Sequence, residues 1–93
     1  MKATIGGKRY NSSTCEVLAE NDLHSYSHNY AGTVSLLRAG NGELLVWCNS
    51  NGQDWSIQDY LVLMAEAGRS IDYFDMNDEQ EARCVELGLT EIV

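Results

Sequence analysis

Two histidines and three cysteines are the residues of this chain best suited to catalysis or metal binding. His24 and His28 are four residues apart, a spacing that brings two imidazoles together only on a helix, where they could hold a transition metal. The surrounding segment, NDLHSYSHNYAG, has no helical period, and no acidic residue or cysteine stands at a matching spacing. We therefore predict no metal site and no cofactor, with both histidines in a solvent-exposed loop.

Cys15, Cys48 and Cys84 are odd in number and far apart, and the chain contains no CxxC motif. This usage is typical of free thiols in a reducing compartment rather than of a disulfide framework or a zinc site. A thiol beside His24 or His28 would form a nucleophilic pair, so a small enzyme or ligand sequestrant is one functional alternative. A domain this small has little room for both a core and a cleft, which favours a non-enzymatic protein.

Carboxylates are the most abundant reactive groups, with fourteen acidic residues against six basic ones and a net charge of −8. Residues 72–93 alone carry seven acids against Arg83. Such a chain is repelled by phosphate, so we expect no direct binding to nucleic acid or to an anionic membrane. These acids do not follow the EF-hand pattern. They predict either a solubilising surface or one that, like a nucleic-acid mimic, binds a basic protein.

The expected partner contacts lie in this acidic third and in the polar, aromatic loop before residue 33. Tyrosine rings are amphipathic and suit an interface. The predicted partner-binding residues are Tyr26, Tyr30, Asp72, Asp75, Asp78, Glu79 and Glu81. We predict no catalytic residue.

The stretch from Thr33 to Cys48, TVSLLRAGNGELLVWC, is the hairpin around which the rest is organised. A type I′ turn at Asn41 and Gly42 would place Leu37 opposite Val46. One face would carry Leu37, Ala39, Leu44, Val46 and Cys48, and the other Val34, Leu36, Leu45 and Trp47. Because both faces are apolar, the hairpin should lie between two layers, with Trp47 buried and Trp55 partly exposed.

The N-terminal third predicts short strands and a loop. Residues 2–10 read as a small hairpin with Gly6-Gly7 at its tip. Residues 13–20 favour a strand or a single turn over a full helix, and residues 21–32 predict a loop.

The C-terminal half predicts two helices. Residues 57–67 favour a helix that ends at Gly68, with a strand through residues 60–64 as the alternative. Residues 71–74 predict a short strand. A final helix follows, capped by Asn77 or Asp78 and ended by Gly88. Its predicted inward stripe is Ala82, Val85 and Leu89, with Cys84 at its edge, and residues 89–93 could add a last strand.

Together these elements predict an α+β fold in a single domain spanning residues 1–93. The fold has a small antiparallel sheet centred on the hairpin 33–48, with one or two short helices packed on it.

Three stretches carry a resemblance: GKRYNSSTCEVLAEND, SLLRAGNGELLV and DEQEARCVELGL. They resemble small accessory proteins of phages and other bacterial mobile elements. In that family GKRYNT-x-TAELLA leads, an LYR-x-x-NGE-x-x-L hairpin follows and an LTEEEA-type helix closes the chain. Here Cys15 replaces the usual alanine, and residues 49–55 replace the usual glycine-rich segment.

That family has no agreed activity, so the resemblance implies only a context. Small acidic products of mobile elements often inhibit host defence proteins, as anti-CRISPR proteins do. Our leading hypothesis is therefore a non-enzymatic inhibitor in the cytoplasm of a bacterial host, with no membrane span and no export signal. Its partner would be a host protein with a basic surface, such as a Cas nuclease or another nucleic-acid-binding defence protein. A virion or plasmid assembly protein is a further alternative, and homodimer formation stays open.

Overall fold

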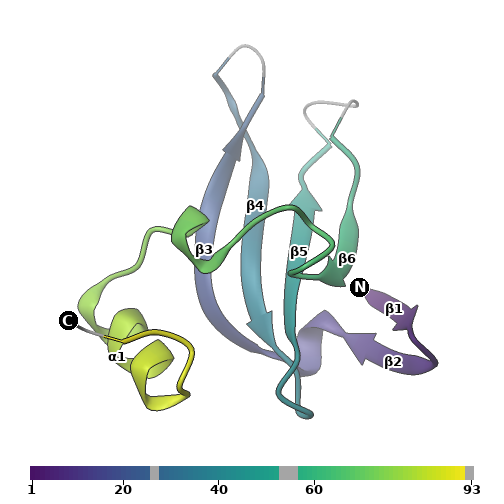
Figure 1. Ribbon diagram of the computed structural model, residues 1–93. Helices are drawn as coiled ribbons and strands as arrows, with labels where there is room; N and C mark the ends of the chain where they lie inside the picture. The colour runs from purple at the N-terminus through teal and green to yellow at the C-terminus, as the bar shows by residue number, and fades with distance from the viewer. Residues whose placement is uncertain (26–27, 53–56, 92–93) are drawn as a thin grey trace.

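The structure, a computed structural model, describes residues 1–25, 28–52 and 57–91. This part of the chain is mostly β, with two antiparallel sheets and one α-helix (Figure 1). One sheet pairs β1 (Lys2–Ile5) with β2 (Lys8–Asn11), and the other has the order β3 (Glu16–His24), β4 (Tyr30–Arg38), β5 (Leu44–Ser50), β6 (Tyr60–Leu63). The remaining elements are the 3₁₀ turns η1 (Ser12–Thr14) and η2 (Ile71–Tyr73) and helix α1 (Asp78–Glu86).

The larger sheet is a meander of consecutive strands rather than an arrangement centred on one hairpin. An α+β class is compatible with this content, and the predicted hairpin is present as β4 and β5. However, β3 and β6 extend the sheet on both sides, so the hairpin supplies only its two central strands. The predicted hairpin at Gly6-Gly7 is confirmed as β1 and β2.

The hairpin turn is one residue longer than predicted. The Ala39 N–H donates to the Glu43 carbonyl at 2.9 Å, and the Gly42 N–H donates to the Ala39 carbonyl at 2.9 Å. Gly42 has a φ of 88°, the left-handed conformation that closes a three-residue loop with a bulge. Leu37 therefore pairs with Leu45 instead of Val46. Because strand side chains alternate, this shift moves every predicted β5 side chain to the opposite face.

The core consists of two apolar clusters, one on each face of the hairpin, as the prediction of two covering layers requires. The first contains Leu18, Ala19, Val34, Leu36, Val46 and Phe74. The second contains Tyr10, Leu37, Ala39, Leu45 and Leu61, with β1 residues packed against it. Trp47 packs against the second cluster but is only half-buried, because β1 and β2 contact only part of that face. Trp55 lies outside the described residues.

The predicted helix over residues 57–67 is wrong, and its strand alternative is correct. Tyr60 to Leu63 pair with β5 as β6, while residues 64–67 form a single turn in which the Ala67 N–H bonds the Leu63 carbonyl at 3.1 Å. Four residues with favourable helix propensity are too few to nucleate a helix when the residues before them can pair with β5. The chain then crosses the face of the sheet that carries the first cluster, where Met64, Ala67 and Ile71 pack (Figure 1).

Several other predicted boundaries are also wrong. The predicted loop over residues 21–32 is mostly strand, because β3 runs to His24 and β4 begins at Tyr30. Residues 71–73 form a 3₁₀ turn in place of a strand. In α1 the fully buried residue is Cys84, predicted at the edge, whereas Ala82 and Val85 are exposed. Residues 89–91 form no strand, and residues 92–93 are not described.

Candidate functional site

Within the described residues, no hydrogen bond joins a histidine to a cysteine: the Cys15 thiol donates to the Asn11 carbonyl, and the Cys84 thiol donates to the Met76 sulfur. His24 ends β3 and His28 lies beyond it, and both are exposed. Cys48 and Cys84 are buried and Cys15 is half-buried, and this burial raises the pKa of each thiol. A raised pKa keeps a thiol protonated and so weakly nucleophilic. Within residues 1–25, 28–52 and 57–91, no three His, Cys, Asp or Glu side chains are placed to hold a metal ion.

The predicted acidic residues lie on η2, on α1 and on the link between them, and all five are exposed: Asp72, Asp75, Asp78, Glu79 and Glu81. Asn77 fixes where α1 begins through a capping box. Its side chain accepts from the Gln80 N–H at 2.9 Å, and the Gln80 side chain accepts from the Asn77 N–H at 3.0 Å. The first helical turn therefore presents carboxylates where the helix dipole favours them.

A two-pronged ion pair fixes α1 to the sheet. The Arg83 guanidinium donates to the Glu16 carboxylate at the start of β3 through Nε at 2.8 Å and Nη2 at 2.9 Å. Arg83 also lies 3.0 Å from Glu86, and the neighbouring Cys84 is fully buried. Arg83 is thus occupied and does not neutralise the acids that the sequence analysis selected.

This ion pair predicts a pH dependence of stability. Hydrogen bonds from Arg83 hold the pKa of the Glu16 carboxyl below its usual value. Because this pKa is lower in the folded state, the ion pair stabilises the fold at a pH above the usual glutamate pKa of about 4.3. That contribution is lost as the pH falls through the lowered pKa. Carboxylates titrate between about pH 5 and pH 3. Over this range the Glu16→Gln variant should therefore lose less thermal stability than the original chain. Parallel losses in melting curves would show that the pair contributes nothing.

Asn21 brings the C-terminal segment against β3, which is an edge strand. Its Nδ2 donates to the Tyr73 carbonyl at 3.0 Å, and its Oδ1 accepts from the Asp75 N–H at 3.1 Å. These bonds hold Asp75 next to Glu20 and Asp22 around a shallow depression of about 360 Å³, which Asn21 and His24 also line. We call Glu20, Asp22 and Asp75 the acidic patch.

Glu20 and Asp22 are not among the predicted partner-binding residues, because the predicted strand or turn ends at residue 20 and Asp22 falls in the predicted loop over residues 21–32. Had β3 been recognised through residue 24, the alternation of Glu20 and Asp22 would have placed both on one face of the strand. Opposite them on β4 are Ser35 and Thr33, and the buried Ser35 hydroxyl donates to the Glu20 carboxylate at 3.0 Å.

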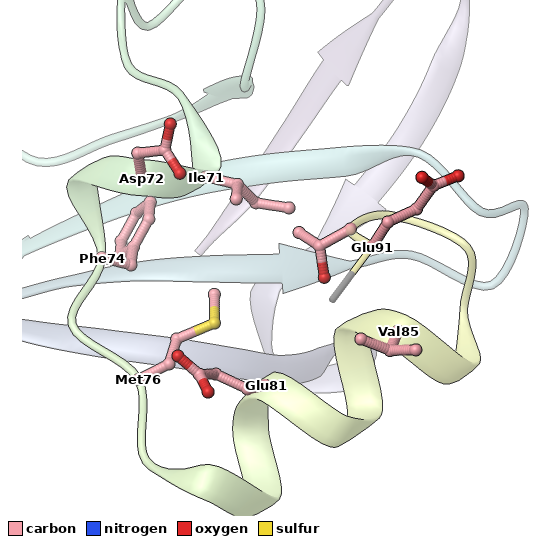
Figure 2. Close-up of a pocket in the computed structure, with 8 residues that line it drawn as sticks. Ile71, Asp72, Phe74, Met76, Glu81, Val85 and Glu91 are labelled. Carbon is pink, nitrogen blue, oxygen red and sulfur yellow. The ribbon is translucent and has the colours of Figure 1, made fainter. Parts of the chain in front are cut away.

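A second depression lies between η2 and α1, and we call it the η2–α1 hollow. Its volume is about 260 Å³, and it is lined by Ile71, Asp72, Phe74, Met76, Glu81, Val85, Thr90 and Glu91. Figure 2 shows Ile71 and Met76 pointing into the space between the two elements and the Glu81 carboxylate beside Met76, while Asp72 and Glu91 lie at the outer margin of the hollow. The hollow thus combines an apolar floor with an acidic rim, and neither Lys, Arg nor His is among its described lining residues.

Tyr30, the predicted tyrosine that the structure describes, does not lie beside the helix acids. Tyr30 is 50% exposed at the start of β4, the end of that strand away from α1 (Figure 1). It pairs with His24, so it lies closer to the acidic patch than to the η2–α1 hollow. Tyr26 lies outside the described residues.

The chain matches no family model, no curated protein and no solved structure. Of the helices in the described ranges, none has the length and apolar character needed to cross a bilayer.

Proposed function

We propose that this chain is a small acidic interaction protein that binds a basic surface of a host protein and thereby inhibits a nucleic-acid-binding defence complex, as anti-CRISPR proteins do. The observation that carries the proposal is the meeting of Asp75 with Glu20 and Asp22 through the hydrogen bonds of Asn21. Acids from two distant parts of the sequence thereby share one surface, which a chain that needed acidity only for solubility would not require.

The electrostatics support a basic partner. The patch acids and the helix acids are exposed, and among the described residues none of them is in an ion pair. Arg83 is held by Glu16 and Glu86, and the Arg69 guanidinium lies 4.3 Å from the centre of the Tyr73 ring. A surface of one sign attracts an oppositely charged partner and accelerates encounter, whereas it repels nucleic acid.

The proposal is tested by removing two patch charges. Asp22→Asn combined with Asp75→Asn keeps the backbone N–H of Asp75 that Asn21 binds, so the fold should persist. The partner is first captured from a bacterial lysate and identified by mass spectrometry. Association of the double variant with that partner should then be slower by about tenfold or more at low salt, and the difference should shrink as salt rises.

The matched control is Glu43→Gln combined with Glu66→Gln, which removes the same charge at two exposed positions away from the patch. This control should associate at a rate close to that of the original chain. Equal association rates for all three proteins at low and high salt would show that the acidity serves only solubility. Inhibition itself is read from phage plating: expression in a bacterium with active CRISPR–Cas immunity should restore plaques of a targeted phage.

A further inference from the structure

The η2–α1 hollow has the dimensions and lining of a receptor for a single side chain. Its volume of about 260 Å³ lies below the range of about 300–1,000 Å³ that is usual for pockets of drug-sized ligands. The floor is formed by Ile71, Phe74, Met76 and Val85. An occupant must therefore be small and must carry apolar groups that can cover this floor.

The rim determines the charge of the occupant. Asp72, Glu81 and Glu91 contribute three carboxylates from η2, α1 and the segment after α1. None of them is in an ion pair or hydrogen bond within the described part of the chain, so their oxygens are free to accept from a ligand. Complementarity then requires a cation with several donors and an apolar stem.

We propose that the η2–α1 hollow binds one arginine side chain of a protein partner. The methylene stem of arginine would lie on the floor, and its planar guanidinium would donate to carboxylates at the rim. Arginine fits better than lysine because it presents five donors in a fixed plane and is more weakly hydrated. This inference rests on the proposed function and deepens it, since it names the group on the basic partner that the acidic surface recognises.

The test uses the full chain and three short capped peptides, Gly-X-Gly, in which X is arginine, lysine or the uncharged isostere citrulline. Binding is followed by NMR through the methyl signals of Ile71, Met76 and Val85. The arginine peptide should shift these signals saturably, with an affinity about tenfold or more above that of the citrulline peptide. Equal affinity for the citrulline or the lysine peptide, or the absence of saturation, would overturn the inference.

A substitution that fills the hollow tests whether arginine binding depends on the shape of the hollow or only on the acidity of the chain. Val85 is 37% exposed on α1, so Val85→Phe should fill the hollow without a change of charge, whereas Ala82→Phe places the same ring outside it. The first variant should lose arginine binding by about tenfold or more, and the second should retain it. If Val85→Phe fails to fold, Asp72→Asn with Glu91→Gln gives the same readout, and unchanged binding by the folded variant overturns the inference.

The two proposals fail in different ways. If the patch variant no longer binds the partner captured from the lysate, and the arginine peptide does not bind the hollow, only the present inference is wrong. If none of the surface variants alters capture of the partner, whether or not the peptide binds, the proposed function is wrong.

Discussion

Replacing Gly32 by alanine should lower the free energy of unfolding by about 2–6 kcal/mol. Gly32 lies within β4, between Leu23 of β3 and Ser50 of β5. Its φ of 123° is one that side chains rarely adopt, and an added Cβ would overlap the Asn49 carbonyl oxygen and lie 2.9 Å from the Ser50 Cα. Both obstacles are backbone atoms of a paired strand, so they cannot move without breaking the ladder.

The measurement is chemical denaturation of Gly32→Ala beside Gly40→Ala. A Cβ at Gly40 would meet nothing within 4 Å, so that control should change stability by less than about 1 kcal/mol. A loss of about 2–6 kcal/mol is a large part of the 5–15 kcal/mol typical of small domains. If the two variants unfold at the same denaturant concentration, β4 and β5 do not approach each other as closely as the structure shows.

Leu36→Ala and Leu37→Ala should each cost about 2–5 kcal/mol, the second large expected effect. The two residues are neighbours on β4 and point to opposite faces of the sheet, yet both have no exposed surface. Leu36 belongs to the cluster completed by Phe74, and Leu37 belongs to the cluster completed by Tyr10. Because both side chains are fully buried, each substitution leaves a cavity.

The comparison that makes this prediction sharp is Val17→Ala. Val17 pairs with Leu37 but is 52% exposed, so its truncation should cost about 0.5 kcal/mol or less. A sheet with one solvated face would tolerate one of the two leucine substitutions. Such tolerance, measured by the same denaturation curves, would contradict the arrangement in two layers.

Where the fold could be predicted from sequence, a local signal was sufficient. Asn77 and Gly88 delimit the helix, because capping depends on neighbours one to four residues away. The turn of the central hairpin was placed in the right segment but one residue short. Asn41 and Gly42 can support either a two-residue or a three-residue loop, and the packing of both faces decides between them.

Where the prediction failed, the deciding partner is distant in sequence. Tyr60 to Leu63 become a strand because β5 offers an edge to pair with, which propensity cannot register. The inward face of α1 depends on Glu16, sixty-seven residues from its partner Arg83. The acidic patch likewise requires Asn21 to bind a segment more than fifty residues away. The five predicted acids follow from charge density alone, whereas the placing of Asp72 and Glu81 at one depression and of Asp75 at another required the fold.

The two hydrogen bonds of Asn21 also bear on the exposed edge of the sheet at β3. An edge strand exposes unpaired N–H and C=O groups that a strand of another molecule can join, and this is a common route to aggregation. Here the side-chain amide of Asn21 binds residues 73–75, so that this segment lies beside β3 in place of a further strand. Irregular register at Leu18 and beyond Leu23, together with the charges of Glu20 and Asp22, further obstructs a regular ladder. At the other edge β1 contacts β6. The asparagine that holds Asp75 beside Glu20 and Asp22 thus also places residues 73–75 where they would hinder a strand of another molecule from joining β3.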